Sequence, residues 1–382
     1  MHQERAIAAL SLANPSLIDI ALATAAERSA RWSDWRWQLQ NALRGADALG
    51  DALDLDADER AWIGSGAAFE VGLTPYFAAL VRADGRGGPL WRQVVPDRAE
   101  AARAAFEKAD PLGEDRHRVA PGLVHKYPDR VLLLVTDTCA SYCRYCTRAR
   151  WVAGHQEPLG SAELDAAVAY IRATPQIRDV LISGGDPLLL ATRRLDALLD
   201  QLAAIPHLRF VRIGTRVPIF LPMRIDAELA RALRPRRVPV WVNVHVNHHA
   251  ELTPDAVAAL STLADAGIPL GGQTVLLRGV NDDEEALRET MFALLGARVR
   301  PSYLFHCDPV AGTAHLRVPV ERGLELMRAL IGHSSGMAVP KYAIDLDGAG
   351  KVPLWPDYVE RVDAETLWVR GYTGELQPYP KR

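Results

Sequence analysis

The sequence lacks the features that mark membrane, secreted and nucleic-acid-binding proteins. No apolar run reaches ~18 residues, the length at which a helix can span a bilayer, and the N-terminus has no basic segment followed by an apolar one. No block of basic residues stands out in a chain whose net charge is −3 and whose pI is about 6.4. We therefore expect neither a membrane nor a nucleic acid as a partner.

Cysteine is also scarce, with four residues in a chain of 382. Three of them fall within one short segment, so they do not form a disulfide framework, and we expect a reducing cytoplasm. No internal repeat or low-complexity tract is visible, and 49% of the residues are hydrophobic. This composition suits one large α/β domain with extensions, or two domains.

The clustered thiols are the most informative feature of the sequence. Cys139, Cys143 and Cys146 form a C-x3-C-x2-C pattern directly after the apolar run 131–135. That run predicts a buried strand, and α/β folds put their chemistry on loops at the carboxyl ends of strands. Three thiolates at this spacing can hold three irons of a cubane cluster and leave the fourth iron open for chemistry. The ring of Tyr145, just before the last cysteine, can stack on a planar ligand.

A structural zinc ion is the alternative ligand of these thiols, with Cys307 or a histidine as the fourth donor. Zinc sites usually pair two C-x2-C knuckles, whereas this chain has one such pair. We therefore predict an iron–sulfur cluster and no zinc.

Alternating strand and helix patterns predict the fold class. Residues 1–120 are expected to be a mostly helical N-terminal region, 121–335 the core, beginning with a loop over 121–130, and 336–382 a C-terminal segment. Six strand–helix units with right-handed crossovers predict an α/β fold, an open (β/α)6 partial barrel, because closure would need eight. The predicted strands are residues 131–136, 180–183, 210–214, 240–245, 273–277 and 301–305.

Polar residues cluster at the predicted strand ends. Gly184, Gly185 and Asp186 follow the second strand, where the glycines let a backbone approach a ligand and Asp186 can accept hydrogen bonds from an ammonium. The same residues also suit an ordinary turn. His245 and Gln273 lie on the fourth and fifth strands, where either a cavity lining or buried hydrogen-bonded pairs would explain them.

Three charged residues have candidate roles in binding. Arg148, close to Cys146, can bind a substrate carboxylate bidentately, although a surface position is the alternative. Asp308, after the sixth strand, can pair with a cationic substrate group. Lys351, in a loop of small residues, can be desolvated, which lowers its pKa and lets it form a Schiff base with pyridoxal phosphate (PLP). A solvated turn lysine is the alternative, and the Walker pattern G-x4-G-K-[ST] is absent there.

Taken together, these stretches resemble the lysine 2,3-aminomutase family of radical S-adenosylmethionine (SAM) enzymes from about residue 30 onward. The segments 263–271 and 273–282 are highly specific to that family. The other matching segments are residues 32–37, 122–130, 139–150, 179–189, 212–224, 241–248, 301–315 and 339–353.

The resemblance implies an open (β/α)6 crescent that binds a [4Fe–4S] cluster, SAM and PLP. By position, the three clustered cysteines would hold the iron–sulfur cluster and Lys351 would be the Schiff-base lysine. The residues implied to border SAM are Gly184, Gly185, Asp186, His245 and Gln273. The residues implied for the PLP phosphate are Lys126, Arg130 and Arg216, with Lys126 standing where the lysine enzymes usually have arginine.

The implied reaction is a radical 1,2-shift that moves the α-amino group of an L-amino acid to Cβ, an isomerase activity. Arg148 would hold the substrate carboxylate, and Asp308 and Asp345 would face its distal ammonium. We expect a basic substrate because a carboxylate in a closed cavity is costly without a cation, and lysine is preferred because its ammonium is compact. Arginine or glutamate 2,3-aminomutase activity, or a radical SAM enzyme without mutase activity, is the alternative.

Two departures from the family pattern affect these expectations. The stretch from Asp345 to Lys351 is one residue shorter than in the well-known lysine enzymes, which makes Asp347 an alternative to Asp345. Those enzymes carry a cysteine-bearing zinc tail, whereas no cysteine follows Cys307 here. The resemblance further implies an electron donor such as a flavodoxin or ferredoxin, and a homo-oligomer.

Overall fold

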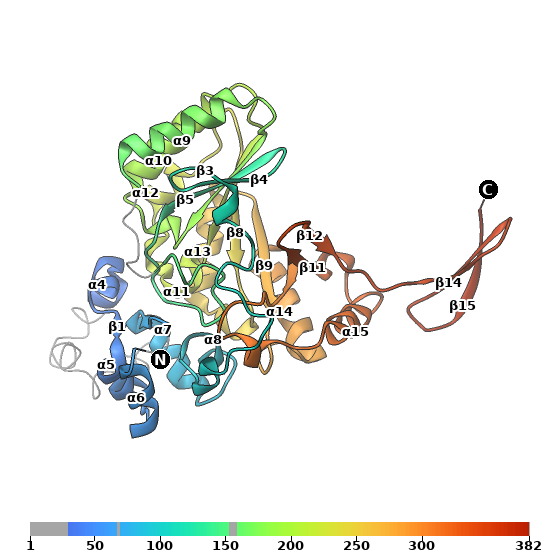
Figure 1. The fold of residues 1–382 in the computed structure, drawn as a ribbon, viewed down its shortest axis with the longest axis horizontal. Helices are drawn as coiled ribbons and strands as arrows, with labels where there is room; N and C mark the ends of the chain where they lie inside the picture. Colours follow the sequence, from blue (N-terminus) through green and yellow to red (C-terminus); the bar gives the residue numbers. More distant parts are fainter. Residues whose placement is uncertain (1–29, 67–68, 153–158, 382) are drawn as a thin grey trace.

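The computed structural model describes residues 30–66, 69–152 and 159–381 (Figure 1). Its centre is a ten-stranded sheet in the order β12-β11-β10-β9-β8-β7-β6-β5-β4-β3. The strands are β3 Arg118–Ala120, β4 Leu123–Tyr127, β5 Arg130–Thr136, β6 Asp179–Gly184, β7 Phe210–Thr215, β8 Val240–His245, β9 Leu270–Leu276, β10 Arg300–His306, β11 Lys341–Leu346 and β12 Gly350–Pro353.

The direction of the strands confirms the predicted α/β class. Neighbouring strands from β5 to β11 are parallel, whereas β3, β4 and β12 pair antiparallel at the two edges. The two edge strands β12 and β3 do not pair with each other, so the sheet stays open. The six predicted strands are present as β5–β10, and the predicted open partial barrel is confirmed.

Helices connect the parallel strands and cover the sheet, and Figure 1 shows α9, α10 and α12 gathered on one side of it. Apolar side chains of α10, among them Leu195 and Leu202, are fully buried, as are Val180 and Ile213 of the strands. Side chains of the parallel strands that face the helices are apolar, because the helices cover that face of the sheet. The helices are α9 Ser161–Ala173, α10 Thr192–Ala203, α11 Val217–Phe220, α12 Ala227–Ala232, α13 Pro254–Asp265, α14 Glu284–Gly296 and α15 Val320–Leu330.

The loop predicted for residues 121–130 is wrong, because this stretch contains β4. β4 forms an antiparallel hairpin with β5, in which Leu123 pairs with Leu133 and Tyr127 with Arg130. Leu123 and Val124 are both buried, which supplies the apolar contact that holds the extra strand on the sheet. Gly122 and Pro128 mark the ends of this strand rather than a continuous loop.

The described part of the N-terminal region is mostly helical and supports the cysteine segment. The backbone N–H of Tyr142 donates to the Gly72 carbonyl (3.1 Å), and that of Arg144 donates to the Gln93 carbonyl (2.8 Å). The buried Arg144 side chain also forms an ion pair with Glu100 (2.5 Å). The elements are α4 Trp35–Gln40, β1 Leu43–Arg44, α5 Gly45–Leu53, α6 Ala57–Gly64, β2 Gly72–Leu73, α7 Pro75–Asp84 and α8 Trp91–Val94.

The C-terminal residues divide between the main sheet and a separate small sheet. β11 and β12 extend the main sheet, whereas β13 Val359–Val362, β14 Thr366–Arg370 and β15 Leu376–Pro380 form a three-stranded antiparallel sheet. Figure 1 shows β14 and β15 projecting away from the body of the molecule. No helix in the described ranges is long and apolar enough to cross a membrane.

Candidate active site

Two adjoining cavities lie along the parallel strands, and they share the side chains of Leu112, Arg148, Asp345 and Lys351. We call them the thiol cavity and the basic cavity. The thiol cavity is further lined by Cys143, Tyr145, Cys146, Thr147, His245, Gln273, Val275, Phe305 and Asp308. The basic cavity is further lined by Glu114, Val124, Lys126, Tyr127, Arg130, Val131, Leu132, Leu181 and Arg212.

The two glycines that were predicted to approach a ligand lie against the backbone that leads into the thiol segment. A Cβ on Gly184 would stand 2.2 Å from the Thr136 carbonyl oxygen, and one on Gly185 would stand 2.3 Å from that of Thr138. The N–H groups of Gly185 and Asp186 donate to the same carbonyls, at 2.5 and 2.8 Å. Only glycine fits this contact, which fixes the backbone just before Cys139.

The Asp186 carboxylate is occupied within the protein. It accepts hydrogen bonds from the Thr215 hydroxyl (2.7 Å) and from the backbone N–H groups of Leu188, Arg216 and Val217 (3.1, 2.7 and 3.1 Å). Burial raises its pKa to about 6, against the opposing effect of these donors. The side chain lines neither cavity, and its hydrogen bonds join the end of β6 to the start of α11.

All three clustered cysteines are free and half-buried. Burial, followed by the neighbouring Cys143, raises the pKa of Cys146 to about 11, so iron would displace thiol protons on binding. Among the described residues, no three His, Cys, Asp or Glu side chains are grouped as the ligands of a single metal ion. A cubane places a different iron at each thiolate, so three cysteines in one segment fit a cluster without converging on a single ion.

Arg216 does not reach the basic cavity, where the phosphate role would require it. Its guanidinium lies behind the thiol segment and donates to Cys143 Sγ (2.9 Å), the Tyr145 hydroxyl (2.7 Å), Gln93 Oε1 (2.6 Å) and Glu251 Oε2 (2.8 Å). The side chain is 7% exposed. Arg216 directly follows β7, and its partners come from the thiol segment, the N-terminal region and the short helix after β8.

Tyr145 and His245 stack on each other, with ring centroids 5.6 Å apart and an interplanar angle of 22°. His245 Nε2 lies 3.1 Å from the Tyr145 hydroxyl, and both rings line the thiol cavity together with Gln273. Burial, followed by the charge of Arg216, lowers the pKa of His245 to about 3. His245 is therefore a neutral hydrogen-bonding group at neutral pH and carries no charge into the cavity.

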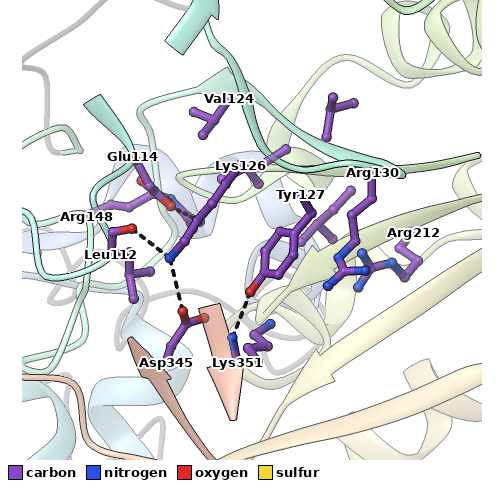
Figure 2. A pocket seen from close by; sticks show the side chains of 13 residues that line it. Leu112, Glu114, Val124, Lys126, Tyr127, Arg130, Arg148, Arg212, Asp345 and Lys351 are labelled. Atoms are coloured by element: carbon purple, nitrogen blue, oxygen red, sulfur yellow. Dashed lines mark hydrogen bonds and ion pairs between the residues drawn. The ribbon is translucent and has the colours of Figure 1, made fainter. Parts of the chain in front are cut away.

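Lys351 stands on the shared wall of the two cavities, on β12. Its backbone N–H donates to the Tyr127 hydroxyl (2.9 Å; Figure 2). Its Nζ lies 4.8 Å from the ring centroid of Phe305 and 5.6 Å from that of Tyr303. The Lys351 side chain remains exposed to solvent because it faces the cavities. Desolvation of its ammonium by the surrounding protein atoms nevertheless lowers its pKa. A lysine with a lowered pKa has more of the neutral amine that a Schiff base needs.

Two carboxylates face Lys351 across the thiol cavity. Burial, followed by the charge of Asp345, raises the pKa of Asp308 to about 7, and the Asp308 carboxylate makes no hydrogen bond or ion pair with the described residues. Asp345 lies 3.3 Å from the Lys126 ammonium. Asp347, the sequence-based alternative to Asp345, instead faces Lys108 and Arg116 and lines neither cavity. Asp345 is thus the second carboxylate of the cavity.

The basic cavity is suited to an anionic group. Its lining has five cationic side chains, those of Lys126, Arg130, Arg148, Arg212 and Lys351, against the two carboxylates of Glu114 and Asp345. Figure 2 shows Arg130 and Arg212 at one end of this cavity and Lys126 with Asp345 at the other. Arg212 is held by Asp179 through two hydrogen bonds (3.0 and 2.7 Å), which fixes its orientation. A phosphate fits this excess of positive charge.

Arg148 lines both cavities and already has one carboxylate partner. Its Nε and Nη2 donate to Glu114 (3.1 and 2.8 Å), and its Nη1 lies 3.4 Å from the Ser183 hydroxyl. Burial alone would lower the pKa of Arg148, but the facing Glu114 raises it. Glu114 uses one edge of the guanidinium, so the edge formed by Nη1 and Nη2 keeps donors for a second carboxylate.

Sequence reasoning missed Glu114, Tyr127 and Arg212, which all line the basic cavity. Glu114 lies in an irregular stretch with no motif, and its partner Arg148 is 34 residues away. Arg212 could have been found from the sequence, because a charged residue in the middle of the mainly apolar strand β7 indicates a cavity or a buried ion pair.

Comparison with known proteins agrees with this chemistry. Residues 133–291 match the model of the radical SAM superfamily, and residues 327–382 match a model described as lysine-2,3-aminomutase. The L-lysine 2,3-aminomutase of Fusobacterium nucleatum is 41% identical over 350 residues, covering 91% of this chain and 82% of that protein. The Bacillus subtilis L-lysine 2,3-aminomutase is 42% identical over 353 residues, with 92% and 75% covered. The glutamate 2,3-aminomutase of Clostridioides difficile is 36% identical over 347 residues, with 90% and 82% covered.

Proposed function

The chain belongs to the lysine 2,3-aminomutase family of radical SAM enzymes, and from that premise we propose that it is a PLP-dependent 2,3-aminomutase of a basic L-amino acid, with lysine preferred. The protein is an isomerase, and its family implies a [4Fe–4S] cluster and SAM. The observation that carries the proposal is the thiol cavity, whose wall combines two cysteines of the predicted cluster site, Lys351 and the carboxylate of Asp308.

The chain's own residues divide the binding of three cofactors between the two cavities. Cys139, Cys143 and Cys146 are the proposed cluster ligands, and His245 and Gln273 border the SAM site. Lys351 is the proposed covalent anchor of PLP. When bound, the cluster and SAM supply a carbon-centred radical that takes hydrogen from the substrate, and PLP supplies a ring that delocalises the unpaired electron.

Arg130 and Arg212 are the proposed phosphate-binding residues, with Lys126 as a third candidate. The support is their common position on the wall of the basic cavity with Lys351. Arg212 takes the role first assigned to Arg216, which lines neither cavity. Lys126 is less available, because its ammonium already contacts Asp345 and the carbonyls of Leu112 and Leu346 (3.3, 3.0 and 3.0 Å).

Arg148 is the proposed partner of the substrate carboxylate. Glu114 occupies the Nε edge of its guanidinium, which keeps the other edge oriented. A carboxylate bound by two N–H groups of one arginine is held in a defined plane, and this orients the α-carbon of an amino acid. The proposed role of Glu114 is therefore to position Arg148.

Asp308 is the feature that favours a basic substrate. Its carboxylate lies in the thiol cavity and forms no ion pair with the described residues, although the charges of Arg317, Lys351 and Lys126 lower its pKa in part, whereas Asp345 directly contacts Lys126. A distal ammonium next to Asp308 would stabilise the ionised carboxylate, and the side-chain carboxylate of glutamate would be repelled. Arginine is the second candidate, because its larger guanidinium needs more room beside Asp308.

Family membership alone supports the remaining proposals about partners and location. A low-potential donor such as a flavodoxin or ferredoxin would supply the electron, a homo-oligomer would be the assembly, and the cytoplasm would be the location.

The cofactor content of anaerobically purified protein tests the proposal. We expect about four irons and four sulfides per chain, together with bound PLP. Borohydride reduction followed by peptide mapping should place the pyridoxyl label on Lys351, and the variant Lys351→Ala should lose it. The chain has four other lysines, Lys108, Lys126, Lys341 and Lys381, so a label on any of these would contradict the assignment. A cluster without PLP would favour a radical SAM enzyme of another type.

A further inference from the structure

Arg216 connects the thiol segment to a buried polar network. It lies between β7 and α11, and its Nη1 donates to both Cys143 Sγ (2.9 Å) and the Tyr145 hydroxyl (2.7 Å). Its Nη2 donates to Glu251 (2.8 Å) and to Gln93 (2.6 Å). Glu251 is fully buried, so the arginine holds its position through a buried counterion.

From this geometry we propose that Arg216 raises the reduction potential of the iron–sulfur cluster through its hydrogen bond and charge at Cys143. The inference rests on the proposed function, in which Cys143 is a cluster ligand. It assigns Arg216 a positioning and tuning role, because the side chain contacts a ligand sulfur and lines neither cavity.

The physical reason is the charge that the cluster gains on reduction. The cluster accepts one electron from a low-potential donor, and no bond to the protein forms or breaks, so its net charge becomes more negative by one. A cation that donates an N–H to a thiolate sulfur stabilises the reduced form more than the oxidised one. Hydrogen bonds to ligand atoms tune metal centres in this way. The negative charge of Glu251 offsets part of the positive charge of Arg216, but Glu251 donates no hydrogen bond to Cys143 Sγ.

The orientation of the guanidinium favours this role over a purely structural ion pair. The contact with Glu251 uses only Nη2, whereas Nη1 is directed at the sulfur and the tyrosine hydroxyl. The buried Nε–H has no hydrogen-bond partner, so this orientation does not satisfy all donors of the arginine. Among the described residues, the sulfur of Cys143 accepts a hydrogen bond from a cationic side chain, that of Arg216.

The test is the midpoint potential of the reconstituted full-length protein, measured by anaerobic titration with dithionite and redox mediators and followed by electron paramagnetic resonance. We expect a more negative potential in Arg216→Gln and an intermediate one in Arg216→Lys, which keeps the charge. Arg224→Gln is the matched control. Arg224 is also a buried arginine, but its guanidinium donates to the carbonyls of Leu188 and Leu190 (3.0 Å each), so its loss should leave the potential unchanged.

Arg216→Gln leaves the buried Glu251 carboxylate without its counterion, which is strongly destabilising. The charge-neutral double variant Arg216→Gln/Glu251→Gln avoids this cost, and its potential should be more negative than that of Glu251→Gln alone. The inference would be overturned if Arg216→Gln had the potential of the parent and Arg216→Gln/Glu251→Gln had that of Glu251→Gln, with four irons bound in each protein. Loss of the cluster from both would also overturn it, because Arg216 would then hold the loop instead of tuning the potential. A parent protein without a four-iron cluster would instead contradict the proposed function.

Discussion

The ionisation of Asp308 should respond to a cation bound in the thiol cavity. Its pKa is about 7 because burial and the nearby Asp345 both disfavour the charged form. Without substrate, the carboxyl group is therefore mostly neutral below about pH 7 and mostly ionised above it. A substrate ammonium binds best to the ionised form, so substrate affinity should fall as the pH falls through this range.

From this we predict that the apparent KM for lysine rises between about pH 8 and pH 6, and that Asp308→Asn removes most of this rise. A hydrogen bond to a charged group contributes about 1.5–3 kcal/mol, so Asp308→Asn should raise KM by about 10- to 100-fold at pH 8. The control is Asp347→Asn, since Asp347 pairs with Lys108 and Arg116 outside the cavities. Equal KM values for the parent and Asp308→Asn across the pH range would remove Asp308 from the substrate site.

At this scale, residues that stand next to a recognisable pattern could be predicted from the sequence. Cys143 and Cys146 follow an apolar run and do line the thiol cavity, and Lys351 does stand on the shared wall. The direction of a side chain at a strand end could not be predicted from the sequence, so the contacts of Arg216 with Cys143 and Glu251 were not anticipated. Glu114 was missed because its contact with Arg148 depends on the folding of the whole chain.

At the scale of elements, the end of β6 supports the thiol segment through its backbone. An alanine at position 185 would place its Cβ 2.3 Å from the Thr138 carbonyl oxygen, so one of the two segments would have to move. Such overpacking costs about 1–3 kcal/mol, and here the movement would fall next to Cys139.

We therefore predict that Gly185→Ala binds several-fold less iron than the parent after identical anaerobic reconstitution. Gly214→Ala is the matched control, because Gly214 lies on the neighbouring strand β7 and its nearest heavy atom would be 3.6 Å from the new Cβ. Iron content would be measured alongside circular dichroism to confirm folding. Full iron binding by folded Gly185→Ala would show that this close contact does not position the cysteines.

Sequence patterns predicted the repeated elements better than the elements that hold the site. The six central strands are apolar runs, and that signal does not depend on their neighbours. The strand β4 was taken for a loop because proline and glycine flank it, whereas its burial comes from pairing with β5. The support of the thiol segment by Gly72, Gln93 and Glu100 involves residues 44 or more positions away, which no local pattern reveals.

At the scale of the whole molecule, the projecting sheet β13–β15 contributes little to the main body. Its exposed side chains include Val362 (60%) and Tyr379 (64%), and one contact with the body is that of the Tyr372 ring with His333 (centroids 5.4 Å apart). β11 is different, because Tyr342 and Ala343 are buried in the main core. Stability of the main fold should therefore depend on β11 and β12 but not on β13–β15.

We predict that a chain ending after residue 356 unfolds within about 2 °C of the parent in thermal denaturation and still accepts the borohydride label on Lys351. A chain ending after residue 338, which lacks β11 and β12 as well, should unfold at a clearly lower temperature. The prediction fails if the chain ending at 356 loses cooperative unfolding at the parent's protein concentration.

The thiol cavity is proposed to join radical chemistry to the movement of an amino group in a basic amino acid. The most direct test is an anaerobic assay of reconstituted protein with SAM, PLP and dithionite on L-lysine, L-arginine, L-ornithine and L-glutamate, with β-amino acid products identified by mass spectrometry. We predict that lysine is converted fastest, to β-lysine, and that omission of SAM abolishes the product. Faster conversion of glutamate than of either lysine or arginine, or cleavage of SAM without any β-amino acid product, would contradict the account.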